Sequence, residues 1–175
     1  PFFTFKDQVI FERDEVVKND GKPYTVFTPF KNRWLLRFNE TECKVSTDSN
    51  FTNLKKSNYP FPNMEDLGFS SSPIQVPEFD LNKVADYDKT RNIPSLDSTS
   101  KIGPHLRFGT VSIRDIVLKV KDVNSTYLSE LIWREFFMQI LWHFPHVVNQ
   151  NFRAKYNGIH WRNNEEEFKK WCNGE

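Results

Sequence analysis

The sequence predicts a mostly α-helical protein, in which a short piece of an α/β unit and a long irregular segment precede a helical part. Three observations support this prediction. Two β-branched and aromatic runs lie near the start, Ser, Asn, Thr and Pro dominate residues 41–77, and capped helical patterns follow from residue 80. At 175 residues the chain can hold one domain or parts of two. We therefore expect three portions: extended runs near the start, an irregular segment that includes residues 41–77, and a helical part from residue 80.

The two runs near the start are typical of β-strands. Residues 7–11 and 24–30 are rich in β-branched and aromatic side chains, and Asp20-Gly21 between them is a strong turn signal. We expect a strand over the first run and an extended segment over the second, which Pro29 would end. Because two strands alone form a marginal unit, they would belong to a larger sheet.

The segment that follows predicts a connection between domains. Its periodicity is interrupted by Pro60, Pro62, Pro73 and Pro77. A span of this length without secondary structure is uncommon inside a compact domain and is usual in an interdomain linker. Since the chain opens at Pro1 without an initiator methionine, we also expect it to be a fragment of a longer protein.

Helical patterns then begin. We expect a helix over residues 78–91 that ends before Pro94, and a second helix that starts with the capping box Ser112-x-x-Asp115. These two helices begin the third portion of the chain.

Two further helices have clear start and stop signals. Ser125 would cap a long helix that Pro145 stops, because proline cannot continue a helix. Asn163 or Asn164 would cap a final helix, with acidic residues in its first turn and Gly174 as its terminator. Residues 80–175 should therefore be all-α.

Composition limits the class of protein. No apolar run approaches the roughly 20 residues that span a bilayer, and the net charge of +1 gives no global argument for nucleic-acid binding. A claim of DNA binding therefore depends on local residues. Cys43 and Cys172 match no metal or redox spacing, so we expect reduced thiols in a soluble, cytoplasmic protein.

The long helix carries charged residues among aromatic ones. On a helical wheel, residues 125–144 leave no wide polar face, so we expect the helix to be enclosed on nearly all sides. One stripe at positions i, i+3, i+4 and i+7 contains Glu130, Trp133, Arg134 and Phe137. One interpretation is an ion pair of Glu130 with Arg134 in a core helix. The other is a stripe that meets a polar ligand, because burial of such a pair costs desolvation.

A hydroxyl-rich loop has the chemistry of a phosphate site. Residues 98–101 offer three hydroxyl groups and the Lys101 ammonium shortly before a helix. The Gly-x4-Gly-Lys pattern of a P-loop is absent, and a plain turn is the alternative. His143 and His146 have no Cys or acidic pair at ligand spacing, so no metal site is expected.

Four stretches together resemble, in order and spacing, the DNA photolyase/cryptochrome family. They are "PYTVFTPFKNRW", "YDKTRNIPSLDSTSKIGPHLRFGTVS", "YLSELIWREFFMQILWHFP" and "GIHWRNNEEEFKKWCNGE". Within the third, "ELIWREFF" is most similar to the class I cyclobutane pyrimidine dimer (deoxyribodipyrimidine) photolyases.

This resemblance implies an architecture and an activity. Residues 1–34 would be the C-terminal end of an α/β, Rossmann-like antenna domain, residues 35–79 the interdomain linker, and residues 80–175 the N-terminal part of the all-helical FAD-binding domain. The intact protein would be a monomer that uses reduced FAD and light to repair pyrimidine dimers in DNA. A second antenna chromophore, of folate or deazaflavin type, could be present in it, whereas the fragment alone should be inactive.

The resemblance also implies roles for single residues. FAD would be contacted by Tyr87, Thr99, Ser100, Lys101, Ile102, Gly103, Tyr127 and Arg134. Damaged DNA would be contacted by Arg91, Glu130, Trp133, Arg134 and Phe137. The reaction would depend on Glu130, Trp133 and Trp161, of which Trp161 resembles the outermost tryptophan of an electron-relay triad.

Some positions differ from the family pattern. Lys101 stands where arginine is frequent, Gly103 where serine is common, and Tyr127 where many members have tryptophan. Three alternatives stay open: a cryptochrome-type blue-light photoreceptor, a (6-4) photolyase, and a helical binding module without a cofactor.

Overall fold

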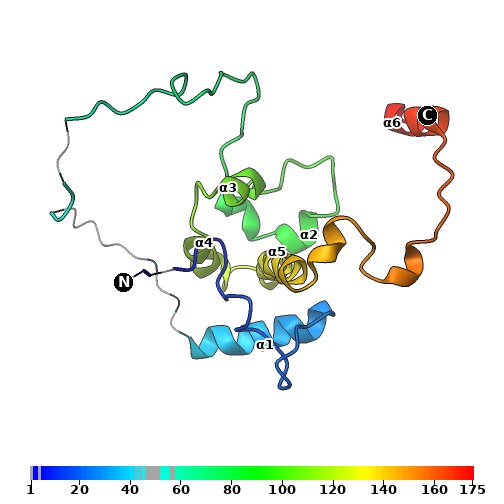
Figure 1. Cartoon of the computed structure of the whole chain (residues 1–175), viewed down its shortest axis with the longest axis horizontal. Helices are drawn as coiled ribbons and strands as arrows, with labels where there is room; N and C mark the ends of the chain where they lie inside the picture. Colours follow the sequence, from blue (N-terminus) through cyan, green and yellow to red (C-terminus); the bar gives the residue numbers. More distant parts are fainter. Residues whose placement is uncertain (1, 4, 42, 44, 46–51, 56–57) are drawn as a thin grey trace.

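The computed structural model describes residues 2–3, 5–41, 43, 45, 52–55 and 58–175, and this part of the chain is helical. Its α-helices are α1 (Phe27–Glu40), α2 (Tyr87–Thr90), α3 (Gly103–Phe108), α4 (Ile113–Val120), α5 (Ser125–His143) and α6 (Glu165–Asn173). Its 3₁₀-helices are η1 (Leu81–Val84), η2 (Pro145–Val148) and η3 (Ala154–Tyr156). The prediction of a mostly helical chain is confirmed. Figure 1 shows α1 to α5 near one another, with α6 lying apart.

The strand predicted over residues 7–11 does not form. The described residues contain no strand, and their β-type pairing is an isolated antiparallel bridge between Val17 and Pro23. The predicted turn is present: the Gly21 N–H donates to the Lys18 carbonyl at 2.9 Å, and Gly21 has a φ of 77°, which favours glycine. The signal for the turn was local, whereas a strand needs a partner.

The second run is largely helical rather than extended. α1 begins at Phe27, so Pro29 lies in the first turn of a helix. Because the N–H groups of a first turn have no partner within the helix, proline is tolerated there. The prediction that Pro29 ends an extended segment is wrong.

The division into three portions remains a prediction. α1 continues through residue 34 and ends at Glu40, where the expected linker has already begun. Within the expected linker, residues 42, 44, 46–51 and 56–57 lie outside the described residues. Residues 58–77 are exposed and contain a turn at 64–68.

The other local predictions are confirmed in part. The helix expected over residues 78–91 is divided into η1 and α2. α4 follows Ser112 without a side-chain capping bond, and the Asp115 side chain pairs with Lys119 at 2.7 Å. α6 follows Asn164, whose side chain accepts from two backbone N–H groups, and it ends at Gly174 with a φ of 78°.

Several of the other elements pack on α5. It contacts α1, α2, α4 and η2. Its buried residues are Tyr127, Leu128, Leu131, Ile132, Glu135, Phe136 and Gln139. At 3.6 residues per turn they occupy one half of the helix surface. Phe137 and Leu141 on the other half are 59% and 50% exposed, so the prediction of a helix enclosed on nearly all sides is wrong.

The ends of α5 are fixed by specific residues. The N-cap is Asn124 rather than Ser125: its Oδ1 accepts the Tyr127 N–H at 3.0 Å. The Nδ2 of the same side chain donates to Asp88 at 2.7 Å and to the Ala85 carbonyl at 3.1 Å, which ties α2 to the start of α5. α5 ends before Pro145, as predicted.

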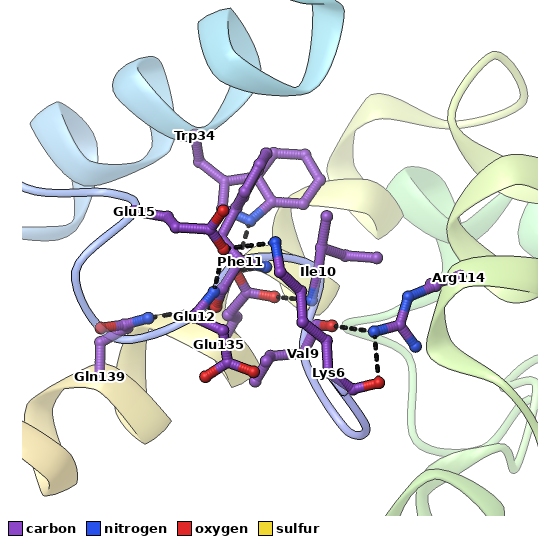
Figure 2. A network of polar contacts seen from close by, with 10 residues as sticks. All are labelled: Lys6, Val9, Ile10, Phe11, Glu12, Glu15, Trp34, Arg114, Glu135 and Gln139. Atoms are coloured by element: carbon purple, nitrogen blue, oxygen red, sulfur yellow. Dashed lines mark hydrogen bonds and ion pairs between the residues drawn. The ribbon is translucent and has the colours of Figure 1, made fainter. Parts of the chain in front are cut away.

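A buried carboxylate joins α5 to the start of the chain and to α1. Glu135 is 3% exposed, and its two oxygens accept the Ile10 N–H at 2.7 Å, the Phe11 N–H at 3.2 Å and the Trp34 Nε1–H at 2.8 Å. Figure 2 shows the carboxylate between these three donors. Phe11 and Trp34 are also in edge-to-face contact, with centroids 5.4 Å apart. The carboxylate therefore satisfies N–H groups inside the hydrophobic core.

The backbone of the whole segment 6–13 is held by side chains from helices. The Arg114 guanidinium of α4 donates to the carbonyls of Lys6, Asp7 and Val9 at 2.9 to 3.1 Å. Figure 2 shows the bonds to Lys6 and Val9. On α5, Gln139 donates to the Phe11 carbonyl and His143 to the Arg13 carbonyl. Glu135, Gln139 and His143 are spaced by four residues and so share one face of α5. These side chains satisfy many backbone groups of a segment that forms no strand.

We expect Glu135→Leu to lower the free energy of unfolding by about 2–4 kcal/mol. The change leaves three buried N–H donors without an acceptor, and each unsatisfied group carries a desolvation cost. Urea denaturation followed by circular dichroism measures the difference. Glu135→Gln, which keeps one acceptor oxygen, should cost less. Equal stability of the Leu variant and the parent would contradict this role.

We expect stability to decrease between pH 4.5 and pH 7. Burial raises the pKa of Glu135 from 4.5 to about 7, against the lowering effect of its three N–H donors. The folded protein then binds a proton more tightly than the unfolded chain does, so this contribution is complete below pH 4.5 and is lost as the pH rises through 7. Denaturation at a series of pH values checks this, and Glu135→Gln should remove the dependence.

Candidate functional site

Tyr127 of α5 is at the centre of the candidate site. Its hydroxyl lies 2.8 Å from the Ser100 Oγ, and both side chains are buried. The Tyr87 ring of α2 meets the Tyr127 ring edge to face, with centroids 5.0 Å apart. Burial raises the pKa of Tyr127, and the bond to Ser100 opposes this in part. Three residues expected at the cofactor therefore come together from α2, α5 and the loop before α3.

Arg91 and Glu130 form an ion pair beside this cluster. The Arg91 Nη1 lies 2.5 Å from the Glu130 Oε1, and the two side chains are 34% and 35% exposed. The guanidinium also lies over the Tyr87 ring, 5.2 Å from its centroid. The hydrogen bond to Glu130 raises the pKa of Arg91 further. Glu130 thus has a partner at the C-cap of α2, and the alternative in which it pairs with Arg134 is wrong.

Arg134 turns away from the stripe that was expected to include it. Its guanidinium donates to the Gln8 carbonyl at 2.7 Å and to the Leu106 carbonyl at 3.4 Å. Burial lowers its pKa. Together with Arg114 it lines a cavity of about 230 Å³ between segment 6–13 and the start of α4. The structure therefore places Arg134 apart from Glu130, although both are on α5.

Trp133 and Phe137 form an aromatic surface on the open half of α5. The Trp133 ring is stacked on Phe27 of α1, with centroids 3.6 Å apart and an interplanar angle of 8°. Phe137 lies against it at 5.4 Å and 22° and is largely exposed. Each is two residues from Glu135, or about 200° around the helix, so this surface faces away from the buried carboxylate.

The loop at residues 99–103 keeps a net positive charge. Lys101 has a φ of 56° and its Nζ lies 2.7 Å from Asp97, which also accepts from Lys83 at 3.1 Å. The two lysines lower the pKa of Asp97. Thr99 is exposed, Ile102 is buried, and a Cβ added at Gly103 would meet no atom within 4 Å. Two ammonium groups against one carboxylate leave a net positive charge at this loop, which favours an anion.

Trp161 is not brought to this cluster. It is 72% exposed, and all residues from 149 to 175 are exposed. In Figure 1 this part of the chain leads away from the other helices to α6. Phe168 and Trp171 of α6 stack on each other, with centroids 5.8 Å apart. An electron-relay role for Trp161 remains a prediction.

Sequence reasoning missed the polar residues that orient the site. Glu135, Gln139 and His143 fix the buried face of α5, and Asn124 ties its start to α2. One signal was available for the first three, because polar residues at i, i+4 and i+8 of an apolar helix share a face. That pattern indicates backbone groups to be satisfied rather than a ligand.

The described residues offer no candidate metal site. Their His, Cys, Asp and Glu side chains form no group of three that could hold a metal ion. A helix with the length and apolar character to cross a bilayer is not found among them. Cys43 and Cys172 are free thiols.

The first and last parts of the chain match known protein families. Residues 1–48 match the family described as DNA photolyase, and residues 127–175 match the family described as FAD binding domain of DNA photolyase. The resemblance predicted from the sequence motifs is therefore confirmed. The second match, to an FAD-binding domain, also supports the prediction of FAD as the cofactor.

Curated relatives carry the name deoxyribodipyrimidine photo-lyase. The relative from Alkalihalophilus pseudofirmus is 26% identical over 196 residues, which cover 100% of this chain and 41% of that protein. The relative from Escherichia coli is 28% identical, with 97% and 41% covered. The relative from Neurospora crassa is 32% identical over 104 residues, or 52% of this chain and 17% of that protein. The chain spans 41% of the length of the first two relatives.

We expect Tyr127→Phe to lower the free energy of unfolding by about 1 kcal/mol. The buried Ser100 hydroxyl loses its partner while the aromatic ring stays in place. Urea denaturation measures the change, with Tyr156→Phe as the control because Tyr156 is 40% exposed. The control should stay within about 0.5 kcal/mol of the parent. A Tyr127 variant as stable as the control would contradict a stabilising hydrogen bond.

Proposed function

From its likeness to the DNA photolyases, we propose that this chain is part of a light-driven DNA repair enzyme. The intact enzyme would be a deoxyribodipyrimidine photo-lyase that splits cyclobutane pyrimidine dimers by electron transfer from reduced FAD. Two relatives that carry this name, from Alkalihalophilus pseudofirmus and Escherichia coli, align with 97% or more of the chain, which supports the proposal.

One structural observation carries the proposal. α5 presents Tyr127 toward the positively charged loop before α3, and it presents Trp133 with Phe137 on its open half. Tyr127 and Trp133 are six residues apart, which is about 9 Å along the helix axis. A flavin beside the first group and a damaged base beside the second would thus lie along the same helix.

The cofactor side is proposed for residues of α2, α5 and the loop. FAD, when bound, supplies the light absorption and the electron. Lys101, assisted by the hydroxyls of Thr99 and Ser100, would hold its phosphates, and Ile102 with Gly103 would form the floor of that loop. Three side chains would contact the rest of the molecule, namely Tyr87, Tyr127 and Arg134.

The DNA side is proposed for residues of the open half of α5 and for Arg91. An unstacked pyrimidine dimer offers flat surfaces and unpaired hydrogen-bonding groups, as flipped-out bases do. Trp133 and Phe137 would stack on the flat surfaces, and Glu130 would accept from a ring N–H. Arg91 would contact a phosphate, which fixes the position of the duplex.

Three further properties are proposed for the intact protein. We infer a monomer, and we infer a cytoplasmic location because the cysteine thiols are free. A second chromophore of folate or deazaflavin type is consistent with the match of residues 1–48 to the DNA photolyase family.

The test uses the longer parent protein, purified and assayed for flavin absorbance. Light-dependent loss of cyclobutane thymine dimers from an oligonucleotide is the expected result. Repair of (6-4) products instead would indicate a (6-4) photolyase. Flavin absorbance without any repair would indicate a cryptochrome-type photoreceptor. A colourless protein without repair would exclude the family's chemistry. The 175-residue chain alone should be inactive.

We expect Trp133→Ala in the parent protein to weaken binding to dimer-containing DNA by about 1–3 kcal/mol, the range for base stacking on an aromatic side chain. Fluorescence anisotropy with a labelled duplex measures this. Trp171→Ala is the matched control, because Trp171 is an exposed tryptophan on α6. Equal affinity of the two variants would contradict the stacking role.

A further inference from the structure

We propose that the Arg91–Glu130 ion pair is a specificity device that weakens binding to undamaged DNA; this inference rests on the proposed function. Its basis is a competition. The two members of the pair are assigned to different features of damaged DNA, Arg91 to a phosphate and Glu130 to a base. In the structure the two side chains bind each other instead.

The geometry shows a pair that is well formed but accessible. The two charged atoms are 2.5 Å apart, and about one third of each side chain is exposed. Arg91 is at the C-terminal end of α2 and lies over Tyr87, so the ring and the carboxylate together fix the guanidinium. A phosphate can approach the pair from solvent and compete for the same N–H groups.

Arg91 selects Glu130 although another carboxylate is nearby in sequence. Asp88 is one helical turn before Arg91, but its Oδ1 accepts from Asn124 at 2.7 Å. Asp86, in the same region, pairs with Lys89 at 2.7 Å. The local acids are therefore engaged, and the pairing across 39 residues is a specific contact rather than a general attraction.

Binding to undamaged DNA would break this pair without compensation. A phosphate that takes Arg91 leaves the Glu130 carboxylate with a negative charge near the DNA backbone and without its partner. The hydrogen bond that forms between Arg91 and the phosphate is offset by the one that breaks between Arg91 and Glu130. Discrimination then comes from an unfavourable interaction with the wrong ligand. The phosphate contact alone carries no sequence or lesion information.

Binding to a flipped-out pyrimidine would compensate for the loss. The imide N–H of a thymine ring is a hydrogen-bond donor that a free carboxylate accepts. Once a phosphate holds Arg91, Glu130 becomes available to this N–H, one turn along α5 from Trp133. Both members of the pair then have new partners, and the cost of separating them is recovered only with damaged DNA.

The experiment compares Glu130→Gln with Asp88→Asn, which removes the same charge close to Arg91 but retains an oxygen for Asn124. Affinities of the parent protein and each variant are measured for one undamaged duplex and for the same duplex with a single thymine dimer. We expect Glu130→Gln to bind undamaged DNA roughly two- to five-fold more tightly than Asp88→Asn does, the scale of a partly exposed ion pair. For Glu130→Gln, the slope of log affinity against log salt concentration should be steeper by about 0.9, which corresponds to one additional phosphate contact.

The outcomes separate this inference from the proposed function. Equal undamaged-DNA affinities of the two variants, with dimer binding intact in the unmodified protein, would overturn the specificity device alone. Failure of the unmodified protein to prefer the dimer duplex would overturn the proposed function. The pair itself is tested without DNA by the ¹⁵N spectrum of the Arg91 guanidinium, whose signal should change in Glu130→Gln and not in Asp88→Asn. An unchanged Arg91 signal would also overturn the inference. The tightening should disappear when Arg91→Ala is combined with Glu130→Gln.

Discussion

The arrangement of this chain depends on the buried carboxylate of Glu135. It joins three regions that are far apart in sequence, because its acceptors are used by backbone N–H groups of residues 10 and 11 and by the indole of Trp34. A carboxylate in a hydrophobic core is costly unless its oxygens are satisfied, so only one rotation of α5 about its axis is compatible with these bonds. That rotation decides which side chains of α5 are left outside.

The residues that α5 exposes are therefore determined by the residues that it buries. Trp133 and Phe137 face outward because each is two positions from Glu135, and Glu130 reaches α2 from the same side. Arg134, at the border, is drawn to the Gln8 carbonyl and leaves the stripe. The candidate site thus has three parts, and all three are positioned by α5. They are the aromatic surface of Trp133 and Phe137, the Arg91–Glu130 ion pair, and the cluster of Tyr87, Ser100 and Tyr127.

Local signals in the sequence predicted local structure well, and pairings across the chain poorly. The end of α5 at Pro145 and the limits of α6 follow from proline, asparagine and glycine, whose effects extend over a few residues. The strand over residues 7–11 was predicted from the same kind of signal, but strand formation depends on a neighbour, and here helix side chains satisfy that backbone. A helical wheel shows only neighbours on the same helix, so it offered Arg134 as the partner of Glu130. The partner in the structure, Arg91, is 39 residues away. The motifs placed Tyr87, Ser100 and Tyr127 in one site, and these three residues lie together in the structure.

Arg114 recognises the carbonyls of Lys6, Asp7 and Val9 and none of their side chains. Substitutions at those three positions should therefore leave this contact intact, because almost any residue supplies the same carbonyl oxygen. Position 114 has no such freedom: a lysine has one ammonium group where the guanidinium offers a planar fork of donors. Natural selection on this contact would thus constrain residue 114 of α4, whereas the residues that it holds could differ among related proteins without loss of the contact.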